Sequence, residues 1–232
     1  MAQIAFDTST KVLAVALADN NRILVETRVN LDSYTHSEYL MKIIDESVSM
    51  AGISNKDLNA IGVVKGPGSF TGLRIGLAVA KGLAVALVLD IYTYTSLEAI
   101  AVSQLGAKEK VLTMLPAQRG EVYGGLFDVS KNKPRLLGDY FLGNPLEFAK
   151  KLSVKDDSLR VVGEGYLKFK DEVDEILGSK IVNLPMSSHI SSAANIVELM
   201  SYDTEMQLNK VSALELEPFY MRLSAAEEQR RK

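Results

Sequence analysis

The stretch Ile4-Ala5-Phe6-Asp7-Thr8-Ser9-Thr10 decides how the rest of the chain is interpreted. Its apolar half predicts a short buried strand, and its polar half predicts a turn that follows the strand directly. Residues 12–18 alternate well enough for a second strand, and residues 22–29 return as a third after the turn cluster Asp19-Asn20-Asn21. The chain therefore opens with a β-meander.

The following segments continue as alternating helices and strands. Leu40, Ile43, Ile44 and Val48 recur at helical spacing and predict a helix over residues 37–51, which Gly52 ends. The next predicted elements are a strand at 60–64, a glycine-rich loop at 66–72, a helix at 73–87, a strand at 91–94 and a helix at 96–105. The order of the first half is thus β-β-β-α-β-α, followed by one further strand and one further helix.

The second half repeats this order. The predicted elements are strands at 111–115, 121–127 and 135–142, a helix at 145–152, a strand at 159–162, a helix at 166–177, a strand at 181–184 and a helix at 191–200. Tandem β-β-β-α-β-α units predict an α/β fold with two similar domains, the plan of the actin, sugar-kinase and Hsp70 superfamily. We expect a first domain of residues 1–106 plus 211–223, a second of residues 107–210, and a charged tail at 224–232.

Composition excludes several classes of protein. The chain has 232 residues and no cysteine, so disulfides, thiolate metal sites and cysteine nucleophiles are impossible. Its net charge is −3, whereas a free-standing nucleic-acid binder is usually clearly basic, so the charge argues against that class. His36 and His189 are the only histidines and lie in different halves, which excludes the HExxH metal motif. The most apolar run, residues 75–89, contains Lys81 and is shorter than the roughly 20 residues that span a bilayer, so we expect no membrane partner.

The turn after the first strand is a candidate phosphate loop. In the superfamily plan, phosphates lie between the domains, at the turns after the first strand of each. Asp7, Thr8 and Ser9 stand at that place; hydroxyls and amides hold phosphate, and an aspartate holds hydrated magnesium. The superfamily usually has glycine where Ser9 stands. The alternative is an ordinary Asx or Ser/Thr turn that ends the strand.

The corresponding turn of the second half lacks an acid. Its sequence is Pro116-Ala117-Gln118-Arg119-Gly120, whereas a phosphotransferase of this plan places an aspartate there for the metal. This argues against a kinase or an ATPase. Arg119 remains a candidate for a phosphate or acid contact, or is a surface arginine at a tight turn. Gly163 and Gly165 allow close approach to an adenosine, or form an ordinary strand-to-helix turn.

The helix after the glycine-rich loop carries small residues in two rows. One row is Gly72, Gly76, Ala80 and Ala84, and the other is Ala78, Gly82 and Ala86. Such rows let another helix approach closely, either within the chain or in a partner. We predict that the helices 37–51 and 73–87 form a docking face for a related protein. The predicted contact residues are Leu40, Ile44, Val48, Gly72, Gly76, Ala80 and Ala84.

Several motifs together resemble one family. The most specific is Gly66-Pro67-Gly68-Ser69-Phe70-Thr71-Gly72-Leu73-Arg74-Ile75-Gly76. The others are residues 4–10, His36-Ser37-Glu38, Lys81-Gly82-Leu83-Ala84, Ser96-Leu97-Glu98, Arg119-Gly120-Glu121-Val122-Tyr123 and Pro218-Phe219-Tyr220-Met221-Arg222. They resemble the TsaB (YeaZ) family over residues 1 to 223. That family commonly reads Asp-Ala-Arg where this chain has Ala117-Gln118-Arg119, which weakens the case for a nucleotide on the second domain.

The resemblance implies a function that composition does not reveal. TsaB-like proteins are the non-catalytic bacterial partners of TsaD. With TsaE they assemble the complex that transfers threonylcarbamoyl from its adenylate to N6 of the adenosine beside the tRNA anticodon. The metal-binding histidines and the active site belong to TsaD. For this chain the resemblance implies no catalytic residue, no metal, and ATP or ADP only at the partner interface.

The resemblance also implies the partners and the place of action. We expect a heterodimer with TsaD, contact with TsaE, a homodimer when TsaD is absent, tRNA contact only through the complex, and a cytoplasmic location. The alternative that the fold leaves open is an actin-like ATP-dependent small-molecule kinase.

Overall fold

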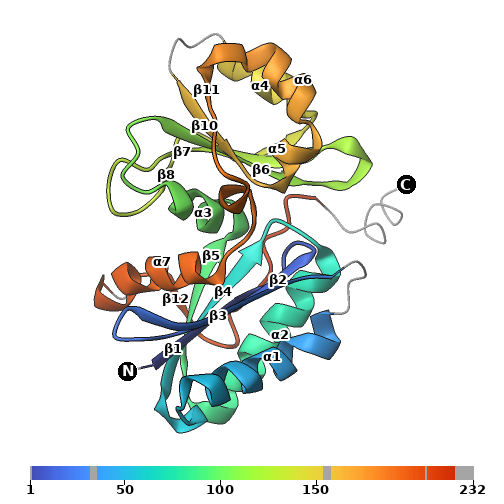
Figure 1. Cartoon of the computed structure of the whole chain (residues 1–232). Coiled ribbons are helices and arrows are strands. Elements are labelled where there is room, and N and C mark those ends of the chain that lie inside the picture. Colours follow the sequence, from blue (N-terminus) through green and yellow to red (C-terminus); the bar gives the residue numbers. More distant parts are fainter. Residues whose placement is uncertain (1, 32–35, 154–157, 207, 223–232) are drawn as a thin grey trace.

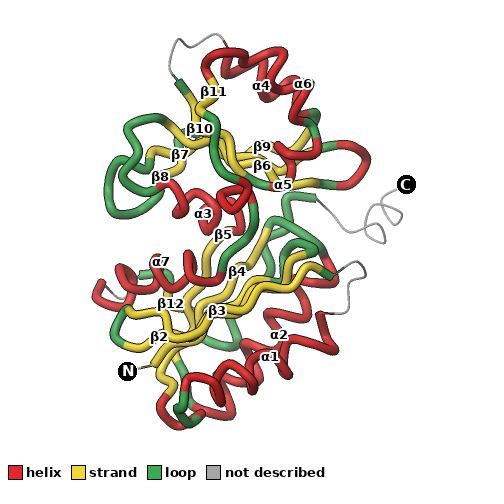
Figure 2. Tube along the Cα trace, in the orientation of Figure 1, coloured by secondary structure: helices red, strands yellow, loops and turns green. Residues whose placement is uncertain are grey.

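The computed structural model describes residues 2–31, 36–153, 158–206 and 208–222, in two α/β units that stack on one another (Figure 1). Each unit is built on its own six-stranded sheet. Figure 2 shows the helices arranged on the faces of these sheets. The predicted tail at 224–232 lies outside the described residues.

The first sheet contains the opening meander at its centre and edge. Its strands are β1 (Ala2–Asp7), β2 (Val12–Asp19), β3 (Arg22–Asn30), β4 (Leu58–Gly66), β5 (Asp90–Thr95) and β12 (Lys210–Val211). They lie in the order β12-β5-β4-β1-β2-β3. The strand β1 pairs antiparallel with β2 and parallel with β4, so its carboxyl end, at Asp7, lies beside the end of β4.

The second sheet repeats this arrangement. Its strands are β6 (Lys110–Pro116), β7 (Val122–Asp128), β8 (Arg135–Leu136), β9 (Phe141–Gly143), β10 (Leu159–Val162) and β11 (Ile181–Val182). The order is β11-β10-β6-β7-β8, with β9 also on β7, and β6 pairs antiparallel with β7 and parallel with β10. The order matches β5-β4-β1-β2-β3 strand for strand. The predicted two-domain, actin-like α/β fold is therefore confirmed.

Three predicted elements are divided in the structure. The helix expected at 96–105 becomes an α-helix over Ser96–Ala101 and a 3-10 helix over Val102–Gln104. The strand expected at 135–142 becomes β8 and β9, separated by a segment in which Gly138 has a positive φ of 90°. The helix expected at 166–177 begins earlier and becomes α5 (Glu164–Lys168) and α6 (Lys170–Leu177). It breaks at Phe169, whose φ of −120° and ψ of 29° are not helical.

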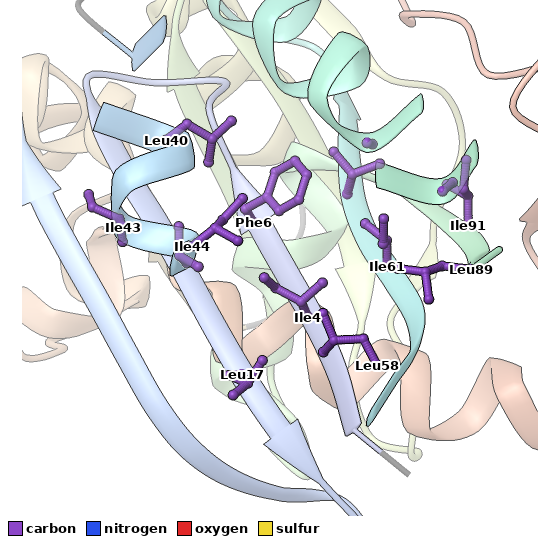
Figure 3. Packing of buried hydrophobic residues seen from close by; sticks show 14 of the residues in the cluster. Ile4, Phe6, Leu17, Leu40, Ile43, Ile44, Leu58, Ile61, Leu89 and Ile91 are labelled. Atoms are coloured by element: carbon purple, nitrogen blue, oxygen red, sulfur yellow. The ribbon is translucent and has the colours of Figure 1, made fainter. Parts of the chain in front are cut away.

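Two long helices cover the outer face of the first sheet. They are α1 (His36–Ala51) and α2 (Phe70–Leu87), which lie side by side (Figure 1). Leu40 and Ile44 of α1 lie against Ile4 and Phe6 of β1 in the core (Figure 3). Helix α4 (Pro145–Ser153) occupies the equivalent place on the second sheet, where Phe148 fills the space above Gly124.

The helix that follows each unit packs across the junction between the units. Helix α3 (Ser96–Ala101) places Leu97 and Ile100 in an apolar cluster with strands of the second sheet. Helix α7 (Ala193–Met206) packs on the first sheet, where Met200 occupies the room left by Gly62. This corrects the predicted second domain of residues 107–210, because α7 covers the sheet of the first unit.

The C-terminal segment returns to the first unit. We expect residues 211–223 to belong to the first domain, and the structure describes them as far as residue 222. The strand β12 pairs with β5, and Leu216 is buried in the core of the first unit. The N–H of Phe219 donates to the carbonyl oxygen of Lys65 at 2.7 Å. Two chain segments far apart in sequence thereby meet beside the glycine-rich loop.

Candidate functional site

A cleft of about 640 Å³ opens between the two units at the carboxyl ends of β1 and β6. The first unit contributes the turn after β1 and the glycine-rich loop, and the second contributes the turn after β6 and helix α5. The lining residues are Ser9, Thr10, Lys11, Gly68, Ser69, Phe70, Thr71, Leu115, Pro116, Ala117, Gln118, Tyr123, Glu164 and Lys168. The superfamily plan places phosphates at this position.

Asp7 lies beneath the cleft and is sealed from it. Its side chain is 1% exposed and does not line the cleft. One carboxylate oxygen accepts the N–H of Ser9 at 2.7 Å, and the other accepts the hydroxyl of Ser191. Burial raises the pKa of Asp7, and the hydrogen bonds from Ser191 and Ser9 offset part of that rise. Asp7 therefore closes an Asx turn and presents no carboxylate to a hydrated metal in the cleft.

The glycine-rich loop is what seals this turn. A Cβ atom on Gly68 would lie 2.4 Å from the carbonyl oxygen of Ser9, and one on Gly72 would lie 2.0 Å from that of Thr8. The Thr8 hydroxyl donates to the carbonyl oxygen of Gly72 at 2.7 Å, and the N–H of Ser69 donates to Ser9 at 2.7 Å. These contacts explain the glycines of the motif, because only a residue without Cβ allows such an approach.

Glu164 is the one carboxylate among the lining residues of the cleft. Its pKa is raised, first by burial and then by the nearby charge of Asp7. The Thr10 hydroxyl reaches it across the cleft at 3.5 Å, a weak hydrogen bond between the two units. The Nε2 atom of His36 forms a hydrogen bond with the carbonyl oxygen of Thr10 at 2.8 Å, which helps to fix the turn after β1.

The structure separates the other predicted phosphate contacts from the cleft. Thr8 is buried beneath α2, so of Asp7, Thr8 and Ser9 only Ser9 lines the cleft. Arg119 is exposed at a left-handed turn with a φ of 58° and does not line it either.

The two glycines of the second unit have a packing role. Cβ atoms on Gly163 and Gly165 would lie 2.2 and 2.8 Å from the backbone of β6, at Met114 and Leu115. They allow α5 to approach β6 closely. This is the ordinary strand-to-helix turn that we give above as the alternative to an adenosine contact. In the described part of the chain, no group of three or more histidine or acidic side chains is placed to hold a metal ion.

The predicted docking residues are mostly buried in the chain itself, and this prediction is wrong for them. Leu40, Ile44, Val48, Ala80 and Ala84 belong to the core between the first sheet and its helices. Gly72 and Gly76 face Thr8, where a Cβ atom on Gly76 would lie 2.3 Å from the hydroxyl oxygen. The physical reason is that Gly72 and Gly76 lie against Thr8 in the turn after β1, and only residues this small let α2 approach that turn.

The second small row of α2 faces solvent. Ala78, Gly82 and Ala86 are exposed, and nothing lies within 4 Å of a Cβ atom built on Gly82. Beside them Val85 is 72% exposed, and Val88, directly after the helix, is 90% exposed. We call Ala78, Gly82, Val85 and Ala86 the outer row. Val85 is not among the predicted docking residues, although an apolar residue beside a small row is a signal in the sequence that could have identified it.

Helix α2 is unusually apolar for a helix with an exposed face. Among the described helices it alone is long and apolar enough to cross a membrane by length and composition. In the structure the residues Gly72, Gly76, Ala80 and Ala84, which we call the inner row, are buried. The apolar and small side chains of the outer row are exposed, with no cover from the described part of the chain. Larger exposed apolar faces commonly mark interaction surfaces.

Comparison with known proteins identifies the family. The chain is 30% identical over 230 residues to the tRNA threonylcarbamoyladenosine biosynthesis protein TsaB of Bacillus subtilis, covering 98% of this chain and 96% of that one. The chain belongs to the TsaB family. The TsaB protein of Haemophilus influenzae is 29% identical over 230 residues, covering 94% of this chain and 92% of that one.

One family model and two solved structures also match the chain. Residues 30–143 match the model of the family TsaD, tRNA N6-adenosine threonylcarbamoyltransferase. The solved structure of YeaZ from Pseudomonas aeruginosa has a TM-score of 0.77 at 23% identity, covering 95% of this chain and 99% of that one. A second structure, described as an uncharacterized protein with similarity to the peptidase YeaZ from that organism, has a TM-score of 0.79 at 24% identity and the same coverage. These likenesses establish the same fold.

Proposed function

We propose that the chain is an accessory, non-catalytic subunit of the machinery that forms N6-threonylcarbamoyladenosine in tRNA, and that it acts by binding a TsaD-type transferase. Membership in the TsaB family is the observation that carries this proposal, because the relatives that span nearly the whole chain are named for threonylcarbamoyladenosine biosynthesis.

The sealed turn after β1 supports a non-catalytic role. Phosphoryl transfer needs a metal and charged groups at the reacting phosphate. Here the carboxylate of Asp7 already accepts hydrogen bonds from Ser9 and Ser191 beneath the glycine-rich loop. The second turn lines the cleft with Ala117 and Gln118 and contributes no acid to it. No observation favours the alternative of a small-molecule kinase. We accordingly propose that the isolated chain binds Mg-ATP weakly or not at all, and that any nucleotide binds at the partner interface.

The outer row of α2 supports a partner with a similar surface. The TsaD model matches residues 30–143, a segment that contains α1 and α2, so a TsaD-type protein carries a related stretch. Two related faces can pair about an approximate two-fold axis, and two copies of one face about an exact one. We therefore propose that the outer row docks TsaD, and that the same face forms a homodimer when TsaD is absent.

The remaining details of the complex belong to the same proposal. TsaE joins the complex, tRNA is bound through the complex and not by this chain alone, and the assembly works in the cytoplasm. Bacterial relatives named for tRNA modification support this arrangement.

Reconstitution of the reaction tests the proposed function. Purified TsaD and TsaE, with threonylcarbamoyl adenylate and an unmodified tRNA, are assayed with and without this chain. We expect modification only when the chain is added, and none from the chain alone. Robust modification by the chain alone, or equal modification in its absence, would overturn the accessory role.

A further inference from the structure

The C-terminal segment crosses from one unit to the other beside the cleft. We call residues 216–222 the strap. It begins at Leu216, which is buried in the core of the first unit, and ends at Arg222, which pairs with a residue of the second unit.

The strap is fixed to the first unit at the glycine-rich loop. The N–H of Phe219 donates to Lys65 at 2.7 Å, and a Cβ atom on Gly66 would lie 2.6 Å from the carbonyl oxygen of Phe219. The ring of Tyr220 stacks on Phe70 with centroids 4.5 Å apart. Arg74 donates through Nε to the Tyr220 hydroxyl at 3.0 Å. Gly66 therefore leaves the space through which the strap passes.

The strap is fixed to the second unit by a charged pair and an aromatic contact. The guanidinium of Arg222 donates to the carboxylate of Glu121, and both side chains are partly buried. The ring of Phe219 lies 5.7 Å from that of Tyr140, whose hydroxyl bonds to Thr95 at 3.1 Å. A charge-assisted arginine–carboxylate pair is among the stronger side-chain contacts.

The strap also lies directly beside the cleft. Gly68, Phe70 and Tyr123 line both the cleft and the small crevice in which residues 219–222 lie. A movement of the second unit away from the first would therefore break the contacts of the strap before the cleft could widen. We infer that the strap sets the angle between the two units and holds the interdomain cleft at its present width, with the pair Arg222–Glu121 as its fastening.

Besides the apolar contacts of α3 with the second sheet, a second ion pair crosses the junction and offers a competing explanation. Lys133, in the β7–β8 turn, donates to both carboxylate oxygens of Asp203 on α7, at 2.9 and 3.1 Å. Since α7 packs on the first sheet, this pair also joins the two units, at a place away from the strap. The experiment must therefore remove the fastening of the strap and leave Lys133 in place.

The absence of cysteine makes the distance between the units easy to measure. Lys11 and Lys168 are exposed on opposite walls of the cleft, so Lys11→Cys and Lys168→Cys place two spin labels across it without competing thiols. Pulsed electron paramagnetic resonance on the whole chain then gives the distribution of label distances. The variants are Arg222→Ala, Glu121→Ala and the exchange Arg222→Glu with Glu121→Arg. The control is Arg135→Ala, which removes an arginine–carboxylate pair with Asp128 inside the second unit.

We expect one narrow distance in the parent and in Arg135→Ala, and a broader, longer distribution in both single variants. We also expect hydrogen exchange at the cleft-lining amides to become about tenfold faster in the single variants, as the loss of a charged hydrogen bond implies. The charge exchange should restore the narrow distance. An unchanged distribution in either single variant that circular dichroism shows to be folded would overturn the inference, as would broadening that persists in the exchange variant.

Discussion

Helix α2 carries two rows of small residues with the same four-residue spacing, and the two rows face opposite sides. Gly72, Gly76, Ala80 and Ala84 face the first sheet, where they touch Thr8 or lie in the core. Ala78, Gly82 and Ala86, with Val85 between them, face solvent. The first row is explained by packing in this chain, and the second is not.

The difference teaches what small residues can mean in a helix. A glycine in mid-helix costs roughly 1 kcal/mol relative to alanine, so each one needs a compensating contact. At Gly76 that contact is Thr8, within the chain. Among the described residues, nothing lies within 4 Å of a Cβ atom built on Gly82, so no contact in that part of the chain compensates for this glycine.

The largest expected effect comes from filling the inner row. In Gly72→Ala the new Cβ would lie 2.0 Å from the carbonyl oxygen of Thr8, so the backbone of the β1 turn must move. We expect the free energy of unfolding to fall by about 3 kcal/mol, as for overpacked cores. Urea denaturation followed by circular dichroism measures it. Native stability in this variant would mean that the inner row does not pack on the turn as described.

The next effect concerns Asp7, which the inner row helps to bury. Burial raises the pKa of Asp7 above its ordinary value of 3.8. At pH values between the ordinary and the raised pKa, the folded protein therefore keeps a proton on Asp7 that the unfolded chain has released. Stability must therefore fall as the pH rises through that window. Asp7→Asn keeps the bond from Ser9 and cannot titrate, so its stability should depend less on pH.

Melting temperatures measured across the acidic pH range test this prediction for Asp7→Asn. The matched control is Asp45→Asn, the same substitution at an exposed position. Some pH dependence should remain in Asp7→Asn, because the pKa of Glu164 is also raised, mainly by burial. Identical pH profiles for the parent and Asp7→Asn would contradict the burial of an ionisable carboxyl at this turn.

A smaller effect of opposite sign is expected on the outer row. Gly82→Ala adds a methyl group into open space and improves helix propensity, so unfolding should require about 1 kcal/mol more. The same denaturation experiment compares it with Gly72→Ala. A loss of stability in Gly82→Ala would show that Gly82 has a contact in this chain.

The smallest effect is expected directly after the helix. Val88 has a left-handed φ of 57°, a conformation that a β-branched residue rarely adopts, and its side chain is 90% exposed. Val88→Gly relieves that strain but adds freedom to the unfolded chain, so we expect a net gain of roughly 0.5 kcal/mol. Equal or lower thermal stability would indicate that the valine side chain stabilises this end of α2.

The sequence predicted the fold well because the tandem units leave a regular pattern. Alternation in the meander and the helical spacing of Leu40, Ile44 and Val48 identify elements and their apolar faces. The sequence did not predict that α7 crosses to the first sheet, because an apolar helix face does not specify which sheet it covers. The contact of Met200 with Gly62 becomes visible only in the structure.

The candidate site was predicted less well, and for the same kind of reason. The sequence located the turn with Asp7, but whether its carboxylate faces the cleft depends on Gly68 and Gly72, which are distant in sequence. The two small rows of α2 are equivalent as patterns, and the row chosen as the docking face was the buried one. Arg119 likewise adopts a left-handed backbone conformation, which depends on the local geometry of the turn and could not be predicted from composition.

Association through the outer row tests the central claim most directly. Sedimentation velocity is measured for Ala78→Trp alone and mixed with TsaD, beside the parent and the control Glu175→Trp, which places tryptophan on the exposed face of α6 in the second unit. Circular dichroism verifies that each variant is folded. We predict that Ala78→Trp stays folded but sediments as a monomer and does not bind TsaD, whereas Glu175→Trp behaves like the parent. If folded Ala78→Trp dimerises and binds TsaD as the parent does, the outer row is not the docking face.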